Sequence, residues 1–275
     1  MTVAVPSHAD RPSFSWLRVR TVVRRHGYVL FRSPHRWFDI AFWPVFDVLL
    51  WGSLGAFVAR ENDVSRAATP YLLAGIMLFH VLFQSQIAVA TGFMEETWTR
   101  NILNVMTTPL RESEYVVGLA LMGLLKLVAA MAMVSLTAFV FYSFGLAQIG
   151  WGLVPVVGVL LLVGWCTAML VIGLLLRYGQ SAEILAWATT FTILAVSGVF
   201  NPVSSIPGVI QPIAKVLPTT YAFSAARELL AGGAVPWGDL GWAILGAIVL
   251  GALSMLYVLR MLRLFRARGY VTRYS

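Results

Sequence analysis

The sequence predicts an all-α integral membrane protein with six transmembrane helices. It also predicts an N-terminal amphipathic interfacial helix, a short cytoplasmic helix between spans two and three, and re-entrant half-helices between spans five and six. Of the 275 residues 59% are apolar and only 12% are charged, and the mean hydropathy is +0.79. A soluble domain usually carries about 25% charged residues, so this chain has too few to cover a water-facing surface. Apolar runs of spanning length and a basic cluster near each end support the same fold class.

Arginine is concentrated near both ends of the chain, and the net charge is +8. Under the positive-inside rule, basic segments next to spans stay in the cytoplasm. We therefore expect both termini to be cytoplasmic, an even number of spans, and a multi-pass location in the cell (plasma) membrane. The same rule explains the basic charge without a nucleic-acid partner. Since Cys166 is the only cysteine, an internal disulfide or a multi-cysteine metal site is excluded, and we expect no bound metal.

Residues 1–36 are predicted to form a cytoplasmic N-terminus that contains an amphipathic helix over 13–32. Arg18, Arg25 and Arg32 lie on a face beside its apolar stripe, so we expect the helix to lie in the headgroup layer with its arginines on lipid phosphates. Ser33-Pro34 should end the helix. We expect no cleavable signal peptide, because a short apolar core with a small-residue cleavage site is missing. The apolar stripe, at steps of three and four residues, consists of Trp16, Val19, Val23, His26 and Leu30.

The six spans are predicted to form a transmembrane domain over residues 37–265, followed by a basic cytoplasmic tail at 266–275. A bilayer core needs about 20 helical residues. The third run exceeds this length, so its helix should tilt or project, whereas the fifth run is short. The apolar runs lie at 38–59, 70–93, 115–144, 151–176, 184–200 and 239–260.

The cytoplasmic segment between spans two and three has apolar residues at helical spacing, including Trp98, Ile102 and Met106. This predicts a short amphipathic helix that stops at Thr108-Pro109. Two interpretations are open: a connector lying on the membrane surface, which periodicity alone favours, or a docking element for a soluble partner.

Residues 197–227 follow the fifth apolar run and are rich in proline, which removes a backbone donor and breaks a helix. The segment is nevertheless too apolar for an ordinary water-exposed loop. Broken backbone at membrane depth is tolerated where protein buries it. We therefore expect two short half-helices that enter the membrane from the outer side and return.

Three ionisable side chains lie within predicted spans: Asp47, His80 and Lys126. Such groups are costly in a bilayer and face protein or water. Counting residues from each span's start places all three near the midplane. We expect a polar cluster in which Asp47 pairs with Lys126 and His80 lies nearby. It could clamp the helices, which is the commoner role, or form a substrate or gating site.

Three parts of the chain together resemble the permease subunit of an ATP-binding-cassette exporter of the ABC-2 type. They are Ser33-Pro34-His35-Arg36 with Trp43-Pro44-Val45-Phe46-Asp47, the loop 100–110, and the segment 197–222. The resemblance implies two copies of the subunit around a shared pathway, each docked to a cytoplasmic ATPase through a coupling helix at 95–107. The residues implied in coupling are Glu95, Glu96, Trp98, Arg100, Ile102, Leu103, Asn104 and Met106.

The same resemblance implies that half-helices within 201–233 line the outer exit. The residues implied there are Phe200, Pro202, Pro207, Pro218, Tyr221 and Arg227. The substrate would be an amphiphilic, lipid-like, drug or glycan molecule moved outward, and the chain would contact membrane lipid.

The sequence has no Gly-x-x-x-x-Gly-Lys-[Ser/Thr] phosphate loop, so we expect ATP and Mg²⁺ on the partner subunit and no cofactor on this chain. Catalytic residues are not predicted: His35 and Asp39 have no partner motif, and Gly179-Gln-Ser181 lacks the second glycine of a serine-hydrolase turn. The alternatives left open are an ion-coupled secondary transporter, since broken helices mark those too, and, with less support, an integral membrane enzyme.

Overall fold

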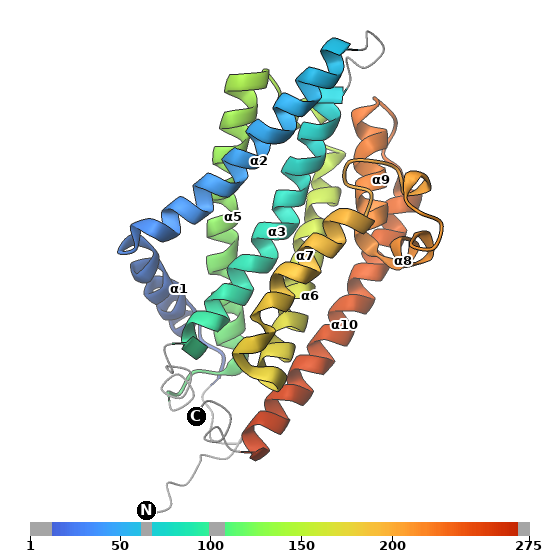
Figure 1. Cartoon of the computed structure of the whole chain (residues 1–275). Helices are drawn as coiled ribbons and strands as arrows, with labels where there is room; N and C mark the ends of the chain where they lie inside the picture. Colours follow the sequence, from blue (N-terminus) through green and yellow to red (C-terminus); the bar gives the residue numbers. More distant parts are fainter. Residues whose placement is uncertain (1–12, 62–67, 99–107, 269–275) are drawn as a thin grey trace, which may run out of the picture.

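The computed structural model describes residues 13–61, 68–98 and 108–268, and all regular structure in these ranges is helical. Long helices pack side by side in one bundle (Figure 1). The α-helices are α1 (Trp16–Phe31), α2 (Pro34–Glu61), α3 (Ala68–Trp98), α5 (Glu112–Tyr142), α6 (Leu153–Tyr178), α7 (Ile184–Val196), α8 (Gln211–Val216), α9 (Pro218–Leu230) and α10 (Trp237–Arg268). Short 3-10 helices are η3 (Leu146–Ile149), η4 (Gly179–Glu183) and η5 (Val203–Ser205).

Five of the described helices, α2, α3, α5, α6 and α10, are long and apolar enough to cross a membrane. The prediction of an all-α, multi-pass membrane protein is therefore confirmed. α5 has 31 residues, or about 46 Å at 1.5 Å per residue, so it exceeds the roughly 30 Å core of a bilayer. α10 continues to Arg268, past the predicted span and into the predicted tail.

α7 is apolar but has only 13 residues, about 20 Å, which is less than the bilayer core. It stops at Val196, four residues before the predicted end of the fifth run. Gly198 then takes a φ of 68°, a left-handed conformation that favours glycine. The chain turns here instead of extending the helix, so α7 alone is not a sixth helix of spanning length.

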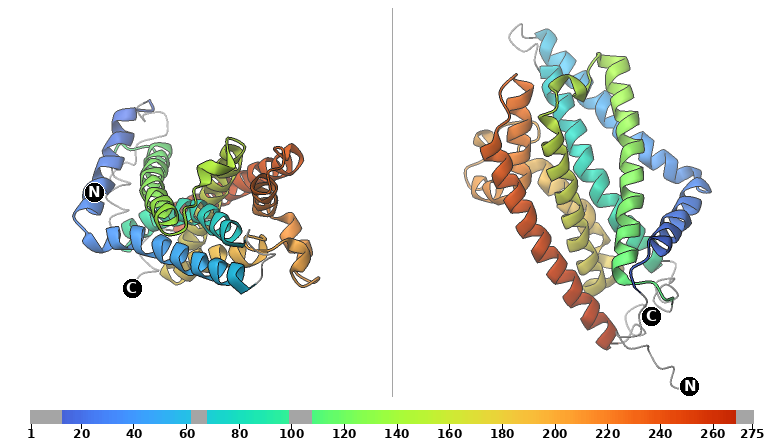
Figure 2. Two further views of the ribbon diagram at one scale, coloured as in Figure 1. Left: turned by 90° about the horizontal axis from the view of Figure 1, so that it is seen from above. Right: turned by 180° about the vertical axis from the view of Figure 1, so that it is seen from behind.

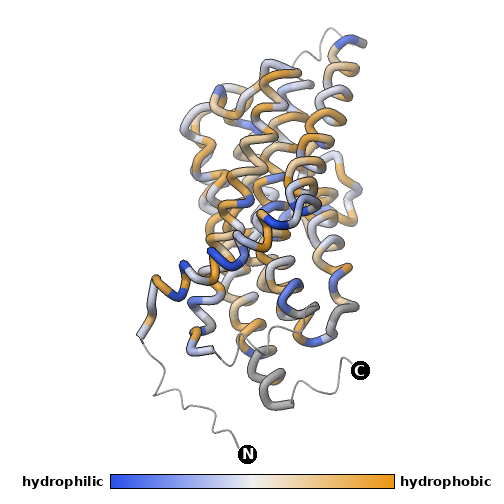
Figure 3. Tube along the Cα trace, turned by 90° about the vertical axis from the view of Figure 1, so that its left-hand side faces the viewer, coloured by the Kyte–Doolittle hydropathy of each residue, from blue (hydrophilic) through white to orange (hydrophobic). Residues whose placement is uncertain are grey.

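α3 is the central helix of the bundle. It packs against α2, α5 and α6, and the view from above places it among them (Figure 2). In the most apolar 18-residue stretch of α3, 83% is buried, whereas the corresponding stretch of α10 is only 22% buried. The outer helices therefore expose broad apolar faces, as expected where lipid surrounds the bundle. Figure 3 shows the same pattern, with apolar residues dominating the long helices and hydrophilic residues marking α1.

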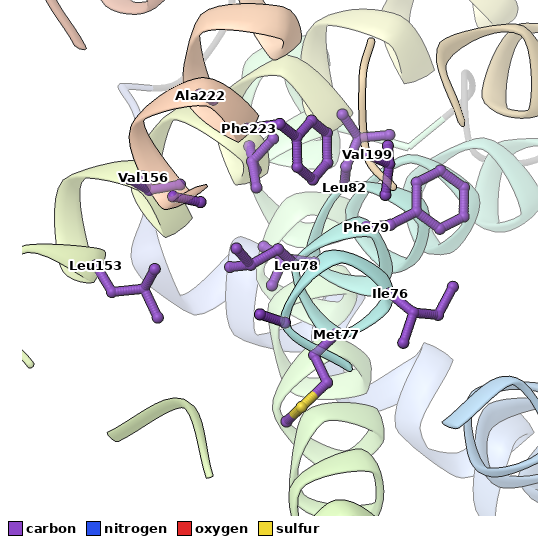
Figure 4. Close-up of a cluster of buried hydrophobic side chains, with 14 of the residues drawn as sticks. Ile76, Met77, Leu78, Phe79, Leu82, Leu153, Val156, Val199, Ala222 and Phe223 are labelled. Atoms are coloured by element: carbon purple, nitrogen blue, oxygen red, sulfur yellow. The ribbon is translucent and has the colours of Figure 1, made fainter. Parts of the chain in front are cut away.

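The apolar core joins α3 to α6, α9 and the turn after α7. Leu78 and Leu82 of α3 lie in one cluster with Val199 and Phe223 (Figure 4), and all four side chains are buried. Glycine makes the α3–α6 contact close, because a Cβ on Gly164 would lie 2.6 Å from the Cβ of Ser85. The core thus extends from the long helices into the segment that follows α7.

α1 lies against α5 at one end of the bundle, the end where α10 finishes, while α8 and α9 lie at the other (Figures 1 and 2). The predicted helix over 13–32 is confirmed, and Pro34 starts the next helix. Its predicted apolar stripe is only partly right, because Trp16 is 67% exposed. The residues that α1 buries are Val19, Val22, His26 and Leu30.

Candidate functional site

The segment after α7 folds into two short helices, α8 and α9, as the proline pattern predicts. Leu217 between them is extended, with φ −76° and ψ 125°, and Pro218 occupies the first turn of α9. Proline is suited to that position because its missing N–H would have no helical partner there. α9 packs on α6 and α10. The prolines therefore divide the segment and also start its second helix.

Hydrogen bonds within residues 197–227 link the parts of the chain before and after the interruptions of the helix. The Ser197 and Thr219 hydroxyls lie 2.6 Å apart and are buried. The Arg227 guanidinium donates to the Gly198 carbonyl, and the Tyr221 hydroxyl donates to the Lys215 carbonyl at 2.9 Å. Buried polar groups need such partners. Arg227 and Tyr221, both predicted to belong to an exit, thus hold the segment in shape.

Aromatic stacking attaches the same segment to α2. The ring of Phe200 stacks on Trp51 with centroids 3.9 Å apart and an interplanar angle of 22°. Pro202 and Pro207, the other two predicted exit residues here, are exposed. The gap between α3 and this segment holds about 10 Å³, room for about one water. The described residues of one chain therefore leave room for about one water molecule here and no more.

The opposite end of the bundle is held by charges. The buried carboxylate of Glu114, at the start of α5, accepts hydrogen bonds from the Arg18 guanidinium, with Nε at 2.8 Å and Nη2 at 2.6 Å. It also accepts the backbone N–H of Ser15 at 2.8 Å and of Arg111 at 3.0 Å. The hydrogen bond to Glu114 raises the pKa of Arg18. One side chain thus fixes the start of α1 on α5.

Two more arginines bind the end of α3. The Arg25 Nη2 lies 2.6 Å from the Glu96 Oε1, and the Arg36 Nη1 lies 2.6 Å from the Glu95 Oε2. Glu96 is buried. The expectation that Arg18 and Arg25 bind lipid phosphates is therefore wrong, because both bind protein carboxylates. The glutamate that binds each arginine lies far from it in the sequence, so the helical periodicity around the arginine does not identify it.

The predicted coupling residues are only partly described. Glu95 and Glu96 lie in the last turns of α3 and pair with α2 and α1 as given above. Trp98 is the last residue of α3, and its side chain lies outside the described residues. The remaining predicted residues, Arg100, Ile102, Leu103, Asn104 and Met106, lie outside them altogether.

The three ionisable residues of the spans do not form one cluster. His80 Nε2 lies 3.2 Å from Asp47 Oδ2, although neither ring nitrogen of His80 has a hydrogen-bond partner in the described part of the chain. Lys126 is not paired with Asp47. It faces a cavity beside Trp37 and Ile40, and Ile40 precedes Asp47 by seven residues, or about 10 Å along α2. Lys126 therefore lies at the level of Ile40 on α2, and the predicted pair of Asp47 with Lys126 is wrong.

A buried polar network that the sequence did not indicate links α3, α6 and α7. The Gln86 side-chain amide donates to the Ala186 carbonyl at 2.8 Å, and the Gln86 Oε1 lies 3.2 Å from the Thr167 hydroxyl. Gln86 lies in an apolar run beside Gln84 and Ser85, and the spacing of these polar residues does not indicate α6 or α7 as the partner. Within the described residues there is no group of three metal-binding side chains, so nothing described there resembles a metal site.

We compared the sequence with models of known protein families. The sequence model of the ABC-2 type transporter family matches residues 19–231, from α1 through the end of α9. The matched range contains Glu95, Glu96 and Glu114 of the charged end and the whole of α8 and α9. No curated protein matches the chain.

Proposed function

Because the chain belongs to the ABC-2 type transporter family, we propose that it forms the transmembrane pathway of an ATP-driven exporter. It is a multi-pass membrane protein and a transport subunit rather than a catalytic one. Permease domains of this family work with ATPase partners. The proposal adds the outward direction, the use of two ATPase subunits that carry ATP and Mg²⁺, and a second copy of this chain.

The observation that supports a driven pathway is that α3 contacts both ends of the bundle. At one end its last turns carry Glu95 and Glu96, which bind Arg36 and Arg25. At the other, Gly75 packs so closely that a Cβ there would lie 2.7 Å from the Val199 carbonyl oxygen. A packed helix moves as a rigid element. A push delivered next to Trp98 would thus reach the segment after α7.

The same proposal gives a role to α7, α8 and α9. The chain crosses the membrane six times. Residues 184–200, which are α7 and the turn that ends it, make the fifth crossing, and α8 and α9 re-enter from the outer side. This leaves both termini in the cytoplasm. The exposed Pro202 and Pro207 then border the exit, and the apolar surface of the helices suits an amphiphilic, lipid-like, drug or glycan substrate.

Charge substitutions at the predicted coupling helix test the ATPase partnership. Trp98→Glu and Ile102→Glu should lower co-purification of the ATPase and uncouple its hydrolysis from transport, while membrane insertion is kept. The matched control is Val209→Glu, a 90% exposed residue near the other end, which should leave ATPase co-purification unchanged. Equal ATPase binding in all three variants would contradict docking at 95–107.

Reconstitution tests the transport reaction itself. The chain with its ATPase in vesicles should show hydrolysis that transported amphiphiles stimulate, with substrate accumulating on the side away from the ATPase. The chain alone should be inactive. Ion-coupled transport by the chain alone would instead establish the secondary transporter.

A further inference from the structure

A cavity of about 490 Å³ lies between α1, α2 and α5. This volume is within the range of ligand pockets, roughly 300–1,000 Å³. Its inner wall is formed by the buried residues Leu30, Ile40 and Met122, one from each helix. At its edge lie Tyr28 and Leu125, which are 53% and 57% exposed. The cavity is therefore a deep apolar groove that opens to the surroundings of the bundle.

Two basic residues line this apolar groove, Arg24 from α1 and Lys126 from α5. Arg24 is held in place, since its Nη2 and Nε donate to the Tyr28 hydroxyl at 2.9 and 3.1 Å, and its guanidinium lies 5.3 Å from the Tyr28 ring centre. A hydroxyl partner does not neutralise a guanidinium, so the charge of Arg24 stays available to a ligand.

Lys126 lies in the middle of α5 and makes no hydrogen bond or ion pair with any residue in the described ranges. The nearby arginines differ: Arg18, Arg25 and Arg36 each bind a carboxylate. A cation within a membrane helix is costly and is found with a partner of opposite charge. The carboxylates that face this region, Glu95 and Glu96, are already bound by Arg36 and Arg25. Among the side chains that the structure describes, no carboxylate is therefore left to pair with Lys126, and an anionic ligand in the groove fits that place.

We propose that the groove between α1, α2 and α5 binds one anionic phospholipid of the surrounding bilayer. Arg24 and Lys126 hold its phosphate region, and the acyl chains lie along Leu30, Ile40 and Met122. A long lysine side chain can extend along apolar surface to bring its ammonium to the headgroup level. The lipid would join α1 and α2 to α5 on the side of the cavity, away from the described ion pairs of Glu95, Glu96 and Glu114.

Gly27 provides a direct way to block the groove. It lines the cavity, and a Cβ added there would meet nothing within 4 Å. Gly27→Trp should therefore fill the site without disturbing the backbone. Gly158 on α6 is the matched control, since it is exposed, its Cβ would also meet nothing, and it lies outside the cavity.

The test is lipid binding to the full-length chain purified in mild detergent, measured by native mass spectrometry and by melting temperature. The probes are phosphatidylglycerol and phosphatidylcholine. Wild type and Gly158→Trp should bind one phosphatidylglycerol per chain and melt several degrees higher with it than with phosphatidylcholine. Gly27→Trp and Arg24→Gln should bind at least fivefold less, and Lys126→Gln should lose the preference, whereas Lys126→Arg should keep it.

Equal binding of the two lipids by wild type would overturn the proposal, as would undiminished binding in Gly27→Trp. Release of the bound lipid on ATP turnover would also overturn it, because the groove would then belong to the substrate path. If Lys126→Gln does not fold, Gly27→Trp and Arg24→Gln still decide the question.

Discussion

The two ends of the bundle are held together by different chemistry. At the α1 end, three arginines bind three glutamates from α3 and α5. At the α8–α9 end, neutral hydroxyls, backbone carbonyls and an aromatic stack join the parts, and the guanidinium of Arg227 binds a carbonyl oxygen. A charged pair tolerates water and headgroups, whereas backbone broken at membrane depth must be satisfied by protein. The comparison indicates that arginines near the first span contribute to helix packing, a role that the positive-inside rule does not assign to them.

The largest expected effect is at the α8–α9 end. Gly75→Leu would force a side chain against the Val199 carbonyl oxygen, 2.7 Å from the new Cβ. Backbone cannot yield as a flexible side chain does, so we expect a loss of about 3 kcal/mol, measured by thermal unfolding in detergent. Gly158→Leu, with open space around it, should unfold like wild type. Equal melting of the two variants would show that the close contact is not needed.

The next effect is at the α1 end. Glu114→Ala removes the acceptor of Arg18, Ser15 and Arg111, so the melting temperature should fall by about 5 °C. Limited proteolysis should then cut within α1. Glu228→Ala, an exposed glutamate at the other end, is the control and should change neither readout. Protection of α1 in the Glu114 variant would mean that packing alone holds the helix.

A pH dependence should come from His26 at the charged end. His26 is buried, and this burial, with a smaller contribution from the Arg25 charge, lowers its pKa, although Glu96 acts in the opposite direction. The unfolded chain then binds a proton before the folded chain does. Stability is fully present above about pH 6.5 and falls as the pH decreases toward the folded-state pKa, by at most about 1.4 kcal/mol per pH unit.

Thermal unfolding between pH 5 and 7.5 measures this loss. In His26→Leu the slope should become shallower over that range, while Ser197→Ala, at the other end, should keep the wild-type slope. An unchanged slope in His26→Leu would exclude His26 as its source.

The smallest effect concerns a neutral hydrogen bond. Ser197→Ala leaves the buried Thr219 hydroxyl without its partner at 2.6 Å, which should cost about 1 kcal/mol in unfolding free energy. Adding Thr219→Val should recover part of the loss, because removing both partners leaves no unpaired group. Additive losses in the double variant would mean that the two hydroxyls do not act as a pair.

The fold could be predicted where a local pattern specified it. Apolar run length predicts the long helices, and the prolines predict that the segment after α7 divides into two short helices. The end of α7 was placed too late, because Ser197, Val199 and Phe200 are compatible with a helix and only the conformation of Gly198 shows the turn. Boundaries that depend on one backbone angle are not visible in an apolar pattern.

The candidate site was harder to predict, because its contacts join residues far apart in the sequence. Residue counting placed Asp47, His80 and Lys126 at one depth, yet α2 carries Ile40, not Asp47, beside Lys126. Arg25 and Glu96 are 71 positions apart, and no spacing rule connects them. The sequence alone indicates that such groups need partners, and packing decides which.

The turn at Gly198 has a consequence for how this protein could diversify. The polar groups of residues 197–227 are satisfied mostly within the segment, by Thr219, Arg227 and Tyr221. Its outward residues, such as Val209 and Val216, are 90% and 80% exposed and take no part in that internal bonding. Mutations there can alter the exposed surface while the scaffold stays intact, so the chemistry of this surface can change by few steps without loss of foldability.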